Sequence, residues 1–195
     1  MPNTRTPHIT CRIAVVLAVL GGLLTFAIHI HTRTVARPPE AITTTHVTCL
    51  APNILAAIIT DPAATTTAPS IAPAPEPGSI PAGFTPTRVV VCTELPPEST
   101  PAHTPAVLET IRDGDLTAVT TTLTQPSQPK SPFSLSDCTI SLGRPAAIWL
   151  TDAHGNAIRP SIPTERSCGH MNPAPFTAIN ALPVTQRHIH PLDTH

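Results

Sequence analysis

The chain has 195 residues, a length that suits one ordinary domain with appendages. Only 12% of the residues are charged, 3% are aromatic and none is tyrosine, whereas proline occurs 26 times. This composition excludes a large aromatic-rich core and a coiled coil. From Glu40 onward, 7 basic residues stand against 12 acidic ones, a difference of −5. A weakly acidic body gains no affinity by releasing counterions from phosphates, so we expect no nucleic acid partner.

An uncharged apolar run, IAVVLAVLGGLLTFAIHI, occupies residues 13–30. Its length is near the lower limit for crossing a hydrocarbon core about 30 Å thick. Arg5 and Arg12 precede the run, as in the charged first part of an export signal. The pattern predicts a transmembrane helix behind a cytoplasmic segment at residues 1–12, so the membrane is an expected partner. A buried core helix is the alternative, but the chain offers little to surround one at this end.

Retention or removal of this segment depends on a cleavage site, which needs small residues at positions −3 and −1. The nearest candidates, residues 25–27 and 34–36, match this requirement poorly. We therefore expect a single-pass anchor in the cell membrane with the C-terminal domain outside. The alternative is a protein secreted after cleavage of the signal.

Residues 31–82 are rich in proline, threonine and alanine and predict a linker. Proline recurs every two to four residues between positions 61 and 81, which favours an extended polyproline-II spacer. Twenty such residues reach on the order of 60 Å at ~3.1 Å each. Within the linker, residues 49–59 (CLAPNILAAII) are apolar enough to form a short helix docked on the domain.

Residues 83–192 are expected to form a small extracytoplasmic α+β domain. The expected strands are 87–94, 107–112, 146–151 and 184–189, the last at an edge, and the expected helices are 115–123 and 176–182. Asp115 is the expected cap of the first helix, and Trp149 the core anchor. Residues 152–156 predict a turn with Gly155 at positive φ, which returns into residues 157–159 as a hairpin.

Four cysteines follow the apolar run, and they allow 3 disulfide pairings. Cys138 and Cys168 flank the expected strand of Trp149 and its hairpin, which favours a bond between them. Cys49 and Cys92 would then tie the apolar part of the linker to the first strand. A metal site is the alternative, although the sequence has no Cys-x-x-Cys pair. Disulfides imply an oxidising exterior, and Cys11, before the run, would stay reduced inside.

Several segments together resemble a group of uncharacterised exported or membrane-anchored actinobacterial proteins. The segments that carry the resemblance are 80–92, 115–129, Cys138, 149–156, 159–164 and Cys168-Gly169. The resemblance covers residues 80–185, and the Arg-Pro-x-x-Pro-Thr segment with the later Cys-Gly is its most specific part. It implies an exported location and disulfides, and it implies no activity. His170-Met171 after the Cys-Gly departs from the pattern.

Ten histidines raise the question of a metal site. His188 and His190 are two residues apart and share one side of the last expected strand, so with His195 they are the candidate ligands for Zn²⁺ or Cu²⁺. No His-Glu-x-x-His pattern accompanies them. The favoured interpretation is solvated histidines near the C-terminus, so we expect no metal and no cofactor.

The sequence contains no Gly-x-Ser-x-Gly elbow, Ser-x-x-Lys pair or glycine-rich phosphate loop. Asp113-Gly114-Asp115 indicates a turn and a helix cap rather than a calcium loop. Glu94, Glu98 and Glu109 are interpreted as solvated charges at strand ends. No catalytic residue is expected. The hypothesis is a non-enzymatic binding or structural module of the cell envelope, with a protein or wall polymer as partner. The alternative is an exported enzyme or metal-binding protein.

Overall fold

The structure is a computed structural model of the chain. It describes residues 35–59, 71–100, 104–129, 146–166 and 169–192. The apolar run at residues 13–30 lies outside these ranges. Within them, no helix is long and apolar enough to cross a membrane. The compact unit of the chain is Ala36–His195.

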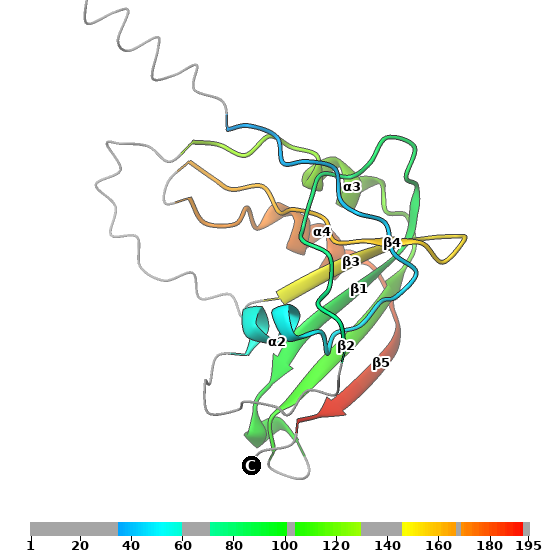
Figure 1. The fold of residues 1–195 in the computed structure, drawn as a ribbon, viewed down its shortest axis with the longest axis vertical. Coiled ribbons are helices and arrows are strands. Elements are labelled where there is room, and N and C mark those ends of the chain that lie inside the picture. The colour runs from blue at the N-terminus through cyan, green and yellow to red at the C-terminus, as the bar shows by residue number, and fades with distance from the viewer. Residues whose placement is uncertain (1–34, 60–70, 101–103, 130–145, 167–168, 193–195) are drawn as a thin grey trace, which may run out of the picture. The chain divides into compact units, whose positions relative to one another are not determined.

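One antiparallel five-stranded sheet organises the compact unit (Figure 1), with the strand order β4-β3-β1-β2-β5. The strands are β1 Pro86–Leu95, β2 Ala106–Asp113, β3 Ala146–Asp152, β4 Ala157–Ile158 and β5 Val184–Pro191. Central β1 pairs with β2 on one side and β3 on the other, and β5 extends the sheet beyond β2. Each strand expected from the sequence overlaps one of these, and β5 is the expected edge strand.

Helices cover both faces of the sheet. This agrees with the consecutive β-branched residues of β1, which place apolar side chains on both sides. Successive side chains of a strand point to opposite faces. Val90 and Cys92 therefore join the core beneath helix α2, Pro52–Ile58, whereas Val89 and Val91 join the core beneath helices α3, Thr117–Leu123, and α4, Ala174–Ala181. We call these two sides the α2 face and the α3–α4 face. The α+β class is confirmed, with helices on both sides of the sheet.

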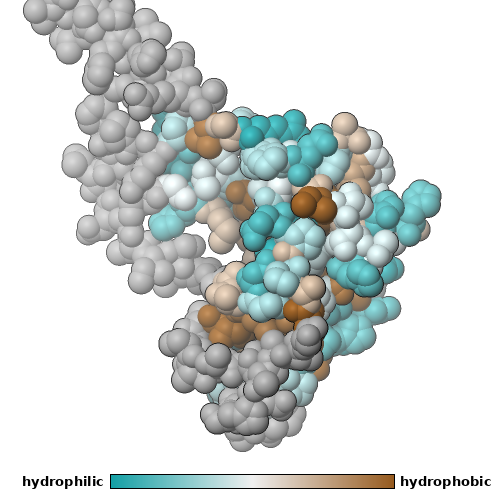
Figure 2. Space-filling model, viewed as in Figure 1, coloured by the Kyte–Doolittle hydropathy of each residue, from teal (hydrophilic) through white to brown (hydrophobic). Residues whose placement is uncertain are grey.

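The core of the α2 face is centred on Trp149 of β3, which is fully buried as expected. Ile54, Leu55 and Ile58 of α2 pack in the same cluster. The short helix expected within residues 49–59 is therefore present and docked. In the space-filling view, apolar side chains gather around α2 while much of the remaining surface is hydrophilic (Figure 2).

Local chemistry explains where α3 begins. The Asp115 carboxylate accepts hydrogen bonds from the backbone N–H and the hydroxyl of Thr117, at 2.9 and 2.6 Å. It thereby satisfies a donor at the first turn that no helix carbonyl can reach. Leu116, Val119 and Leu123 are buried on the α3–α4 face. Asp115 therefore holds the first turn of α3 as expected, although Leu116 and not Asp115 is the N-cap residue.

The described parts of residues 31–82 pack on the sheet domain from Ala36 onward, so the compact unit begins well before the expected Gly83. Proline-rich sequence suggested a solvated spacer, but extended backbone can still pair through its amides and carbonyls. Thr44 exchanges two hydrogen bonds with Ala157 of β4, at 2.9 and 2.6 Å. The buried guanidinium of Arg159 donates to the Pro75 carbonyl at 3.0 Å. Residues 60–70 of the expected spacer lie outside the described ranges.

Gly78 lies where two of these extended segments run side by side, joined by a parallel bridge between Glu40 and Ser79. Its neighbour Ser79 donates to the Pro39 carbonyl, and Ala41 donates to the Ser79 carbonyl, both at 2.8 Å. A Cβ added at Gly78 would lie 2.5 Å from the backbone nitrogen of Ala41 and 2.6 Å from the Pro39 oxygen. Only glycine permits this close backbone approach.

Candidate functional site

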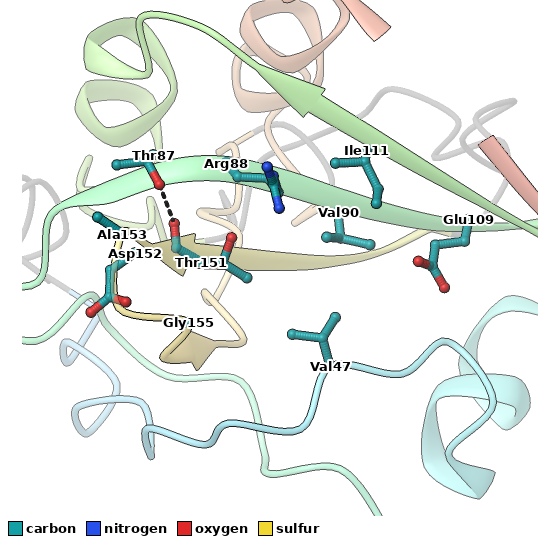
Figure 3. A pocket seen from close by; sticks show the side chains of 10 residues that line it. All are labelled: Val47, Thr87, Arg88, Val90, Glu109, Ile111, Thr151, Asp152, Ala153 and Gly155. Atoms are coloured by element: carbon teal, nitrogen blue, oxygen red, sulfur yellow. Dashed lines mark hydrogen bonds between the residues drawn. The ribbon is translucent and has the colours of Figure 1, made fainter. Parts of the chain in front are cut away.

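An open trough of about 390 Å³ lies on the α2 face, beside α2, between the sheet and the extended segment that carries Val47. Figure 3 shows Val47 across from the side chains of Arg88, Val90, Glu109 and Ile111. These four residues share one face because β1 and β2 pair Val90 with Ile111 and Cys92 with Glu109. The volume is within the range of small-molecule sites.

Arg88 lies within the trough, between the apolar floor and the Asp152–Gly155 turn. Its Nε donates to Asp113 Oδ1 at 2.8 Å, and Nη2 lies 3.5 Å from Oδ2. The two side chains are 48% and 35% exposed, so water screens this ion pair. The hydrogen bond from Arg88 lowers the pKa of the Asp113 carboxyl, and the positive charge of Arg88 and the Thr185 hydroxyl act in the same direction. Arg88 thus stays charged and held in place at the trough.

Glu109 lies on the other side of the apolar floor. Its Oε2 lies 3.1 Å from Nε2 of His190, which reaches it from edge strand β5. The Glu109 side chain is 18% exposed. Oε1 has no hydrogen bond to another described residue. The interpretation of Glu109 as a solvated strand-end charge is wrong, because the residue lies in the middle of β2 and pairs across the sheet with Cys92.

A rigid turn closes the trough beyond Arg88. The Asp152 carboxylate accepts hydrogen bonds from the backbone N–H of His154 and Asn156 and from the Asn156 side chain, all at 2.8 Å. These bonds, led by the Asn156 side chain, lower the pKa of Asp152. Gly155 has φ +83°, as the sequence predicts for this hairpin. The turn is therefore held by its own side chains.

The Cys49–Cys92 disulfide lies at the α2 end of the trough. Both cysteines are almost fully buried, and the bond joins the chain just before α2 to the centre of β1. The favoured pairing of these two residues is confirmed. Cys138 and Cys168 lie outside the described residues, so the second pairing stays a prediction.

His188 and His190 share the α2 face of β5, as expected, but they contact different partners. His188 Nε2 is 3.4 Å from Gln186 Oε1, whereas His190 contacts Glu109. His195 lies outside the described residues. In the described part of the chain, no three His, Cys, Asp or Glu side chains are grouped closely enough to hold a metal ion.

The trough was not predicted from the sequence, although the residues that β2 contributes to it follow a local pattern. Val107, Glu109, Ile111 and Asp113 alternate along β2 and therefore share a face. This period of two could have shown that Glu109 and Asp113 lie on one side with buried neighbours. The opposing residues Val47 and Arg88 come from other segments, and no local pattern connects them. No family model, curated protein or solved structure matches the chain.

Proposed function

We propose that the chain is a binding module of the cell envelope, anchored through residues 13–30 with its sheet domain outside. The observation that carries the binding role is the trough, whose charged side chains are held in place before any ligand arrives. Arg88 is positioned by Asp113 and Glu109 contacts His190, while Val90 and Ile111 form an apolar floor between them. A small number of polar groups that converge on an apolar surface is typical of ligand sites.

The external location is supported by the Cys49–Cys92 disulfide. Disulfides persist in oxidising compartments and are rare where thiols are kept reduced. The resemblance to exported actinobacterial proteins points the same way. The domain would thus present its trough to a protein or wall polymer of the envelope.

The location is tested by fusing an epitope tag to the C-terminus of the full chain in a bacterial host. We expect antibody to bind intact spheroplasts, and peptide mapping to show Cys49 linked to Cys92. A tag reached only after lysis, with Cys49 and Cys92 free, would refute the external placement.

The binding role is tested by placing a photoreactive amino acid at position 47, inside the trough. The control position is 187 on β5, which pairs with Thr110 and so faces the α3–α4 side. We expect crosslinked adducts in the native envelope from position 47 and none from position 187. Equal labelling from both positions, or none from position 47, would count against a binding role for the trough.

A further inference from the structure

We infer that the trough binds a short zwitterionic peptide of three or four residues, with its carboxylate at Arg88 and its ammonium at Glu109. The inference rests on the proposed binding role and specifies the ligand of that site. It follows from the separation of the two charges, from the surface between them and from the chain segment that faces them.

The spacing of Arg88 and Glu109 along the sheet follows from the register of β1 and β2. Arg88 pairs with Asp113, and Glu109 pairs with Cys92, four residues further along β1. Four residues of antiparallel strand span about 13 Å. An extended peptide spans about 3.3–3.6 Å per residue, so its terminal charges match this separation at three or four residues.

The surface between the charges suits a peptide with small or apolar side chains. Val90 of β1 and Ile111 of β2 form the floor, and Val47 lies opposite them (Figure 3). An apolar floor gives no partner to a third charge, so a ligand charged in its middle would lose hydration there. Thr87, Thr151 and Asp152 line the trough beside Arg88. The Asp152 carboxylate is a third charge in the trough, and it accepts hydrogen bonds from the backbone N–H of His154 and Asn156 and from the Asn156 side chain.

Arg88 and Glu109 can each serve a ligand as well as their present partner. A guanidinium carries five N–H donors in a fixed fork, and Asp113 accepts from Nε and Nη2. Arg88 is about half exposed and can therefore meet a carboxylate from the trough side. Glu109 uses Oε2 toward His190, and Oε1 is the acceptor for an ammonium group.

The test is a titration of the full, oxidised chain in mild detergent with trialanine and tetraalanine, followed by NMR or calorimetry. We expect a dissociation constant on the order of 1 mM for a ligand of this size. Amidation of the peptide carboxylate, or acetylation of its amine, should each weaken binding about fivefold, as expected for one screened ion pair. Equal affinity for the free and doubly blocked peptides, or no binding of either, would overturn the inference without any variant.

Two variants assign each charge to its end. In Arg88→Gln, free peptide should bind about fivefold more weakly, and the free acid and the amide should bind equally. In Glu109→Gln, the free amine and the acetylated peptide should bind equally. The matched controls Arg187→Gln, on the α3–α4 side, and Glu98→Gln, on the exposed 3-10 turn Pro97–Ser99, should change nothing.

The outcomes separate this inference from the broader binding role. The result could instead be that Arg88→Gln binds the free amine and the acetylated peptide equally, while Glu109→Gln binds the free acid and the amide equally. The peptide would then lie in the opposite orientation, and the inference as stated would be refuted. If peptides do not bind but crosslinks form at position 47, the zwitterionic ligand is wrong and the binding module stands. If neither peptides nor crosslinks are found, both are wrong.

Discussion

The side chain of Asn53 in α2 forms hydrogen bonds with both the backbone carbonyl and the backbone N–H of Ala74. Its side-chain nitrogen donates to the Ala74 carbonyl at 2.8 Å, and its side-chain oxygen accepts from the Ala74 N–H at 2.9 Å. An amide side chain thus replaces a strand partner for a segment within the proline-rich stretch. The buried Ala74 joins the same core cluster as α2. This pair links α2 to the segment that leads into Gly78.

Asn53→Ala should release Ala74 and lower the free energy of unfolding by about 1–2 kcal/mol, because two hydrogen bonds are lost. Urea unfolding measures the loss, and faster amide exchange at Ala74 shows where it occurs. Asn53→Asp is the comparison variant, because it keeps an acceptor for the Ala74 N–H but places a carboxylate oxygen against the Ala74 carbonyl. It should destabilise the protein at least as much as Asn53→Ala, and an Asp variant as stable as the wild type would contradict the donor bond to that carbonyl.

Removal of the Cys49–Cys92 bond should lower the free energy of unfolding by about 2–4 kcal/mol. The bond closes a loop across a sequence separation of 43, and the chain-entropy estimate for such a loop is about 4 kcal/mol. The double variant Cys49→Ala, Cys92→Ala keeps both sites apolar, which suits their burial. Denaturant unfolding of the oxidised proteins is the measurement. A double variant as stable as the wild type would show that the bond does not restrict the unfolded chain.

Gly78→Ala should be more damaging than Gly83→Ala. At Gly78 the new methyl group meets backbone atoms of Pro39 and Ala41, which cannot move aside as a flexible side chain would. We expect a loss of about 2–3 kcal/mol or more, as for an overpacked site. At Gly83 the methyl group meets nothing within 4 Å, and only the positive φ of +82° costs about 1–2 kcal/mol. Thermal unfolding of both variants tests this order, and the reverse order would contradict the close backbone contact at Gly78.

The Arg88–Asp113 pair should make a small contribution to stability that disappears in acid. Arg88 holds the pKa of Asp113 below the ordinary value of 3.8. The contribution is therefore present in full above that value and is lost as the pH falls through the lowered pKa of the folded protein. Because both groups are partly exposed, it should not exceed about 1 kcal/mol.

Arg88→Gln should accordingly raise the pKa of Asp113 toward its ordinary value in an NMR titration. The stability difference between this variant and the wild type should shrink as the pH falls below the ordinary aspartate pKa of 3.8 and through the lowered pKa of Asp113. Asp115 is the internal control, because the Thr117 hydroxyl is the first cause of its lowered pKa. A shift of Asp115 as large as that of Asp113 would show a general effect of charge rather than loss of the pair.

The sequence by itself determined the local elements. The consecutive valines of β1 require two buried faces, because Val89 and Val90 point to opposite sides of the sheet. Asp115 and Gly155 mark the start of α3 and the turn after β3 through chemistry confined to a few neighbouring residues. Even α2, inside a proline-rich stretch, was recognisable from its apolar residues.

Only the tertiary structure decided which distant residues meet. Arg88, Glu109 and His190 come from three strands, and their proximity depends on strand order and register. The docking of residues around Gly78 depends largely on backbone hydrogen bonds, which every residue except proline can donate and which therefore leave little side-chain pattern. The trough is formed by such long-range pairing, so neither composition nor periodicity could place Arg88 and Glu109 on either side of one apolar floor.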